Sequence, residues 1–181
     1  MINLKFSKNI SCLAKGGIIL IVIFICWSNT CFGQKIAVPE NIQAALLTKV
    51  LKYNPQIPQN SQIKILVVYN DNTILDKDEF IKGLGSSMAF KAITTRELAK
   101  NISEFDVVYF MEGINGFSEL CRSNKVLSVT ATTRFVEEGG EISLGFGIEN
   151  SKPKILVNLT SLDMEGQSFS SDILRIGKIF K

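Results

Sequence analysis

The segment Ile63–Tyr69 reads Ile-Lys-Ile-Leu-Val-Val-Tyr, which is a nearly continuous apolar run. Runs of this kind are typical of strands in parallel sheets, where helices cover both faces of the sheet. Residues 106–111 and 126–130 have the same character, and helical patterns separate the three runs. We therefore expect three adjacent, buried and parallel strands.

Helical patterns precede and follow these strands. Pro39 opens a predicted helix over residues 39–53, whose apolar face has the members Ile42, Ala45, Leu46, Val50 and Tyr53. Residues 76–79 resemble a capping box that starts a second helix, and a weaker strand follows at 88–93. A clear capping box at 94–97 starts a third helix, and further helical segments are predicted at 117–123 and 133–137.

The C-terminal part has a different pattern. Residues 141–148 alternate between apolar and polar, residues 150–153 form a turn, and residues 154–159 form another apolar strand. These two strands should pair as an antiparallel hairpin. A short helical segment, a turn at Gly166 and a final helix capped by Ser170 complete the chain. The prediction is one α/β domain with a mostly parallel sheet flanked by helices on both faces, a C-terminal antiparallel hairpin and a final helix.

The first 33 residues have the features of a signal peptide. Three lysines precede an apolar run over residues 17–27, and small residues precede the junction between Gly33 and Gln34. The run is shorter than the roughly 20 apolar residues that a spanning helix needs. We therefore expect a cleaved signal peptide over 1–33 and one domain over 34–181. An uncleaved N-terminal anchor and lipidation at Cys31 remain the alternatives.

Cleavage at this junction changes the charge of the protein. The whole chain has 20 basic and 17 acidic residues, and the three lysines of the signal peptide leave 17 of each sign. A neutral domain has no large basic field to attract nucleic acid. We therefore expect an exported protein with no nucleic-acid partner.

The cysteine and histidine content limits which disulfides, catalytic bases and metal ligands the protein can have. Cys12, Cys26 and Cys31 lie in the predicted signal peptide, so Cys121 is the one cysteine of the mature chain, which cannot form an internal disulfide. Cys121 follows the apolar spacing of Phe117 and Leu120 and is expected to be buried. The chain has no histidine, which removes the commonest general base and metal ligand.

Other polar positions have simple structural explanations. Gly113 and Gly116 lie between a strand and a helix, where a phosphate could bind, but a tight turn explains them better. Acidic or amide side chains that could hold a ligand or a cation equally suit turns and helix starts; they are Asp71, Asn72, Asp76, Asp78, Glu79 and the loop residues Glu137, Glu138 and Glu141. We expect no catalytic residues, no metal site and no cofactor, and therefore no enzyme.

Three segments carry a resemblance to a known family. Residues 38–51 resemble the opening helix of one subgroup of the YfiR family. Phe135, Gly139-Gly140, Ile142 and Leu144 resemble its aromatic–glycine–glycine–apolar segment. Residues 153–159, followed by Gly166, Phe169, Ser170 and Leu174, are similar to its C-terminal end. The order and spacing of these motifs make the case.

The resemblance implies a function. The best-known members are periplasmic repressors that bind the periplasmic sensor domain of an inner-membrane diguanylate cyclase, which keeps cyclic-di-GMP output and biofilm formation low. It therefore implies a periplasmic regulatory protein with a membrane-bound sensor enzyme as its partner, and a homodimer is compatible with it. Those members carry disulfides that this chain cannot form. A small-ligand receptor, with its ligand at the carboxyl edge of the sheet, is the alternative.

The sequence also suggests where a partner would bind. Loops on a rigid scaffold commonly carry recognition, and polar residues form the rim of most interfaces. The loop before the predicted hairpin has both features, and its candidate partner-binding residues are Arg134, Glu138, Gly139, Gly140 and Glu141.

Overall fold

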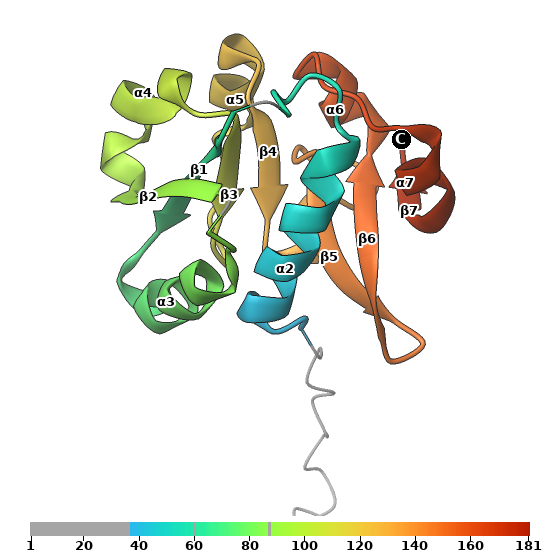
Figure 1. Ribbon diagram of the computed structural model, residues 1–181, viewed down its shortest axis with the longest axis horizontal. Coiled ribbons are helices and arrows are strands. Elements are labelled where there is room, and N and C mark those ends of the chain that lie inside the picture. The colour runs from blue at the N-terminus through green and yellow to red at the C-terminus, as the bar shows by residue number, and fades with distance from the viewer. Residues whose placement is uncertain (1–36, 60, 87) are drawn as a thin grey trace, which may run out of the picture. The chain divides into compact units, whose positions relative to one another are not determined.

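The computed structural model describes residues 37–59, 61–86 and 88–181. These residues form a seven-stranded sheet in the order β2-β1-β3-β4-β5-β6-β7 (Figure 1). The strands are β1 (Ile63–Tyr69), β2 (Met88–Thr94), β3 (Val107–Phe110), β4 (Leu127–Thr130), β5 (Leu144–Glu149), β6 (Lys152–Asn158) and β7 (Lys178–Phe180). The α-helices are α2 (Glu40–Val50), α3 (Ile74–Gly83), α4 (Leu98–Asn101), α5 (Ser118–Asn124), α6 (Leu159–Met164) and α7 (Ser171–Ile176). The predicted signal peptide lies outside the described residues.

The centre of the sheet confirms the prediction from the apolar runs. Strands β1, β3 and β4 are adjacent and parallel, with Leu66 opposite Val108 and Val108 opposite Ser128. All four residues of β3 are buried, as are all four of β4. Because both faces of β1 and β3 are covered, these two strands could be recognised from nearly continuous hydrophobicity, whereas β4 also contains the buried polar residues Ser128 and Thr130.

The C-terminal hairpin is also confirmed, and the structure adds a strand to it. Strands β5 and β6 pair antiparallel, with Phe146 opposite Ile155. The sequence prediction ended the chain in a helix, whereas β7 follows α7 and pairs parallel to β6, with Ile179 opposite Val157. A strand of three residues is too short to show a hydrophobic period, so only its pairing identifies it.

Helices cover both faces of the sheet, as predicted. The chain moves outward from β1 to β2 through α3 and then back to β3 through α4. Right-handed crossovers in opposite directions place these two helices on opposite faces. Helix α2 packs against α3, and Gly83 permits the close approach, since a β-carbon there would lie 2.6 Å from the carbonyl oxygen of Asn41.

The predicted apolar face of α2 was partly right, since Val50 is buried and Leu46 packs against the core, but it was rotated by part of a turn. The buried residues are Gln43, Ala44, Leu47 and Val50. Ile42 is 39% exposed, and Tyr53, in the 3₁₀ turn that follows α2, is 44% exposed. Gln43 can be buried because its amide nitrogen donates to the Val38 carbonyl oxygen at 2.7 Å and its amide oxygen accepts from the Tyr109 hydroxyl at 2.8 Å. These tertiary partners cannot be read from a helical pattern.

Helix starts were predicted with mixed success. The capping box between Thr94 and Glu97 is present. The helix predicted to start at residues 76–79 instead follows a 3₁₀ turn capped by Asn70, and α3 begins at Ile74. Ser170 occupies the cap position of α7, but its hydroxyl makes no capping hydrogen bond and is buried without a partner.

Candidate functional site

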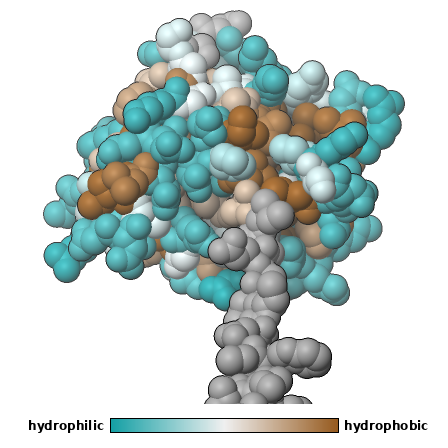
Figure 2. All heavy atoms as spheres, turned by 90° about the horizontal axis from the view of Figure 1, so that it is seen from below, coloured by the Kyte–Doolittle hydropathy of each residue, from teal (hydrophilic) through white to brown (hydrophobic). Residues whose placement is uncertain are grey.

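A cavity of about 330 Å³ opens beside the loops that follow β3 and β4. Strand β4 points its carboxyl end toward the lower side of Figure 1, its neighbours β3 and β5 run parallel to it, and Figure 2 shows the domain from that side. Hydrophilic residues cover most of this surface, and hydrophobic residues gather in separate patches. The cavity is lined by Asn115, Gly116, Arg134, Phe135, Gly139, Gly140, Glu141 and Ile142. It lies where open α/β sheets commonly bind ligands.

The loop after β3 is held by its glycines and by one side chain. Gly113 and Gly116 have φ angles of 77° and 81°, which confirms the predicted tight turn. The Gly113 amide donates to the Thr132 hydroxyl at 2.9 Å, which ties this loop to the loop after β4. The two loops therefore form one wall, although 19 residues separate Gly113 from Thr132.

The loop after β4 depends on its glycine pair. Gly139 has a φ angle of 74°, and a β-carbon on Gly140 would lie 2.3 Å from the Phe135 carbonyl oxygen. The same oxygen accepts a hydrogen bond from the Ile142 amide at 2.9 Å. Because neither glycine position suits a side chain, the two glycines allow this loop to fold back on Phe135.

Asn158, at the start of α6, anchors this loop from the interior. Its side-chain nitrogen donates to the carbonyl oxygens of Val136 at 3.2 Å and Gly140 at 3.1 Å. Its side-chain oxygen accepts from the Ser161 amide at 3.0 Å, which caps α6. Asn158 therefore caps α6, and the turn predicted at Gly166 is present, since Gly166 has a positive φ of 66°.

Of the two charged side chains in the cavity, Glu141 is hydrogen-bonded and Arg134 is not ion-paired among the described residues. Glu141 accepts a hydrogen bond from the Ser118 hydroxyl at 2.8 Å. The Arg134 guanidinium lies 4.9 Å from the centre of the Phe135 ring, and among the described residues it forms no ion pair. The cavity thus offers a guanidinium without an ion-pair partner among the described residues, together with the aromatic ring that it contacts.

The structure brings together most of the predicted partner-binding residues. Arg134, Gly139, Gly140 and Glu141 line the cavity, whereas Glu138 is exposed on the same loop and does not line it. Asn115 and Gly116 come from the other loop and were not among the predicted residues. Their proximity depends on the hydrogen bond between Gly113 and Thr132 and on the folding of the second loop back on Phe135, which a sequence pattern does not specify.

The other polar candidates lie elsewhere or have structural roles. Asp71 and Asn72 belong to the 3₁₀ turn capped by Asn70, and neither lines the cavity. Asp76, Asp78 and Glu79 are residues of α3. Across 37–59, 61–86 and 88–181, no group of three acidic, cysteine or histidine residues could hold a metal ion.

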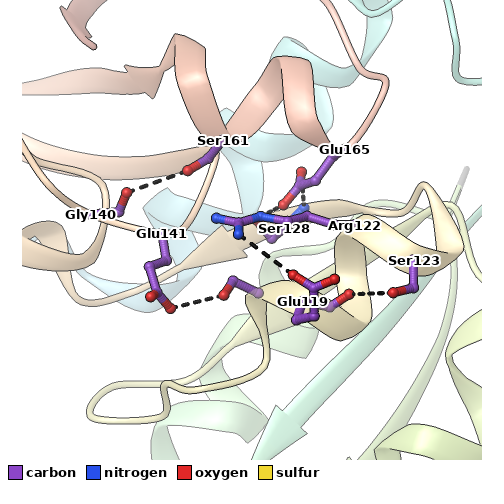
Figure 3. Close-up of polar contacts among 9 residues, drawn as sticks. Glu119, Arg122, Ser123, Ser128, Gly140, Glu141, Ser161 and Glu165 are labelled. Atoms are coloured by element: carbon purple, nitrogen blue, oxygen red, sulfur yellow. Dashed lines mark hydrogen bonds and ion pairs between the residues drawn. The ribbon is translucent and has the colours of Figure 1, made fainter.

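Sequence reasoning missed a buried carboxylate behind the cavity. Glu165 is fully buried, and its carboxylate accepts hydrogen bonds from the Ser128 amide at 3.0 Å, the Ser143 hydroxyl at 2.6 Å and the Ser128 hydroxyl. Figure 3 shows the carboxylate directed toward Ser128, with the Arg122 side chain beside it. The two serines are 37 and 22 residues away in sequence, so only the position of Glu165 before Gly166 was visible.

Burial determines the acidity of this group. It raises the pKa of the Glu165 carboxyl to about 7, against the opposing effects of the hydrogen bonds from Ser128 and Ser143 and of the Arg122 guanidinium. Burial likewise raises the pKa of the Cys121 thiol, so this cysteine stays protonated at neutral pH. Cys121 is fully buried, as predicted.

Comparison with known proteins agrees with the motifs. A family model described as YfiR/HmsC-like matches residues 40–178. The chain belongs to this family. The match includes the opening helix, the Phe135–Gly140 loop and the end of the sheet. The YfiR/HmsC-like family is one of periplasmic regulatory proteins of the diguanylate cyclase system, which supports a regulatory role for this member.

Solved structures show the same fold at low sequence identity. A conserved domain protein from Vibrio cholerae is 14% identical over 76% of this chain and 60% of its own, with a TM-score of 0.53. The ABC domain from Streptococcus pneumoniae, solved in complex with L-Trp, is 11% identical over 79% of this chain and 62% of its own, also with a TM-score of 0.53. The YfiR/HmsC-like chain thus spans about three fifths of the length of each.

No curated protein matches it in sequence. Among the described helices, none has the length and hydrophobicity needed to cross a membrane.

Proposed function

We propose that this YfiR/HmsC-like protein is exported to the periplasm and there represses or modulates an inner-membrane signalling enzyme by direct contact. The diguanylate cyclases are the first candidates for that enzyme, and another membrane sensor is the second. The observation that carries the proposal is the family match over residues 40–178.

The proposed signal peptide supports export, and N-terminal sequencing of the envelope form should read Gln34 as the first residue. A mature chain starting at Met1 or Cys31 would contradict it.

The charges of the 133–142 loop favour a role in direct contact with a partner. The charged side chains of the cavity are those of Arg134 and Glu141, and Glu141 accepts a hydrogen bond from the Ser118 hydroxyl at 2.8 Å. Exposed charges on this loop suit the polar rim of an interface. We therefore place the partner-binding surface on this loop, with Arg134 and Glu138 on its rim.

Reversing both rim charges, with Arg134→Glu and Glu138→Arg together, should reduce capture of the membrane partner by at least about tenfold. The melting temperature should stay nearly unchanged, because exposed charges contribute at most about 1 kcal/mol to stability. Capture is measured by crosslinking in envelope extracts, followed by identification of the bound membrane enzyme.

A matched control tests whether position matters. Arg175 and Asp172 form an exposed ion pair on α7 with nitrogen and oxygen 3.2 Å apart. Reversing this pair changes the same two kinds of charge and keeps the net charge constant. Capture by the control should equal that of the wild type. Full capture by the folded Arg134/Glu138 variant would move the binding surface elsewhere.

The cavity supports a second candidate function, that of a small-ligand receptor. The Arg134 guanidinium and the Phe135 ring could together hold the carboxylate and the apolar part of an amino-acid-like ligand. The Streptococcus pneumoniae domain of similar fold was solved with L-Trp. Calorimetric titration with L-Trp tests this function. Saturable binding that Arg134→Ala weakens would support it, and the absence of heat at millimolar L-Trp would count against it.

A further inference from the structure

We propose that Glu165 is a proton-operated latch for the candidate site: the protonated carboxyl holds α6 against β4 and β5, and loss of the proton loosens the 133–142 loop. This regulation rests on the proposed binding function of that loop. The latch itself is a property of the isolated protein and can be tested without a partner.

The geometry joins three elements at one carboxyl group. Glu165 follows the last residue of α6, Ser128 lies in β4, and Ser143 directly precedes β5. The Ser128 hydroxyl also accepts a hydrogen bond from the Ser143 amide at 3.0 Å. Glu165, Ser128 and Ser143 therefore form a closed polar cluster, and all three residues are buried.

This cluster can accommodate either protonation state. The ionised carboxylate accepts from the Ser128 amide and from both serine hydroxyls. A proton on Oε1 would instead be donated to the Ser128 oxygen, whose own hydrogen turns away, while Oε2 keeps its two donors. One hydroxyl rotation is thus enough to convert the network. The neutral form keeps almost every contact and removes a buried charge.

The charges around Glu165 only partly compensate its ionised form. From α5, Arg122 lies near the carboxyl and Cys121 contributes a neutral thiol. Among the described residues the buried Arg122 Nε has no hydrogen-bond partner, and the Nη1 atom of Arg122 lies 3.7 Å from a carboxylate oxygen of the exposed Glu119. A β-carbon built on Gly166 would lie 4.0 Å from Cδ of Lys125, while β4 and the start of β5 bind the carboxyl through Ser128 and Ser143. Ionisation therefore leaves an incompletely paired buried charge, which is costly.

The other end of α6 holds the candidate site. Asn158, before the first residue of α6, binds the carbonyl oxygens of Val136 and Gly140. The Ser161 hydroxyl also donates to the Gly140 oxygen at 3.4 Å, as Figure 3 shows. Helix α6 has six residues, so its two ends lie about 9 Å apart and cannot move independently. A shift of Glu165 away from Ser128 therefore reaches the loop.

The direction of the pH effect follows from the raised pKa. The unfolded or opened carboxyl has its ordinary pKa of 4.5, whereas the folded group titrates at about 7. Between these values the closed state binds more protons than the open state, so stability falls as the pH rises. The contribution is complete below pH 4.5 and is lost as the pH passes through about 7. The latch is closed in mild acid and weakened in mild alkali.

Amide hydrogen exchange on the full chain tests this proposal. Protection of residues 140–144 and 159–167, corrected for intrinsic exchange, should fall at least about tenfold between about pH 5.5 and about pH 8.5. In Glu165→Gln, which keeps the shape but cannot ionise, the fall should disappear. Glu119→Gln, the same change at an exposed carboxylate beside Arg122, should keep the wild-type profile.

Two outcomes would overturn the latch: flat protection in the wild type, or an equal fall in Glu165→Gln. If Glu165→Gln does not fold, the ¹³C carboxyl shift of Glu165 in the wild type decides, and a midpoint below about pH 5.5 overturns the proposal. The latch and the proposed function fail separately. If hydrogen-exchange protection falls with rising pH as expected but no partner is captured at any pH, the proposed function is contradicted while the latch is supported.

Discussion

Val108→Asp should abolish the folded state. Val108 is fully buried in β3, between Leu66 of β1 and Ser128 of β4. A carboxylate at this position would be buried without a cationic partner, at a cost above about 5 kcal/mol. Because whole domains have a free energy of unfolding of about 5–15 kcal/mol, most or all of the stability should be lost. Circular dichroism and urea denaturation of the purified variant measure this loss.

The control for this variant is Leu75→Asp, the same kind of change at a residue that is 79% exposed. Its free energy of unfolding should stay within about 0.5 kcal/mol of the wild type, since surface substitutions rarely exceed this. A Val108→Asp variant that unfolds at the wild-type urea concentration would refute the burial of β3.

Asn158→Leu should lower the free energy of unfolding by about 3 kcal/mol or more. The substitution keeps the size of the side chain but leaves the Val136 carbonyl oxygen and the Ser161 amide without their partner, and removes one of the two donors to the Gly140 carbonyl oxygen. Each buried polar group left unpaired costs about 1–3 kcal/mol. The loss is measured by urea denaturation, and the 133–142 loop should lose hydrogen-exchange protection as well.

Asn124→Leu is the matched control for Asn158. The Asn124 side-chain nitrogen makes one hydrogen bond, to the Leu120 carbonyl oxygen at 2.9 Å, at the half-buried end of α5. Water can replace this bond, so the loss should be about 1 kcal/mol or less. Equal losses in the two variants would show that Asn158 does not anchor the loop.

The accuracy of the sequence predictions followed the range of the interactions involved. Strand β1 was predicted with its observed bounds, because seven residues of nearly unbroken hydrophobicity identify a strand covered on both faces. The buried face of α2 was only partly right, because the burial of Gln43 depends on Tyr109, which is 66 residues away. Local patterns thus identified elements, and distant partners determined their orientation.

The residues of the candidate site also fall into two groups: those that a local sequence pattern indicated and those that depend on distant contacts. Gly139 and Gly140 were noticed in the sequence because paired glycines mark a backbone that folds closely. Asn115 and Gly116 could not be assigned to the same cavity, because the approach of the two loops depends on the hydrogen bond between Gly113 and Thr132, which are 19 residues apart in sequence. Glu165 was invisible as a site, because its burial comes from the packing of α6 against β4 and the start of β5, and this burial is what raises the pKa of its carboxyl.

By itself, the sequence determined the α/β class, the parallel centre of the sheet, the C-terminal hairpin and the family. These features depend on hydrophobic periods and on the order of short motifs, which are local along the chain. Only the tertiary structure decided which loops form the cavity, how Asn158 anchors one of them and where Glu165 is buried. Those features depend on contacts between residues far apart in sequence, and desolvation and hydrogen bonding act on a side chain only after the packed interior has formed.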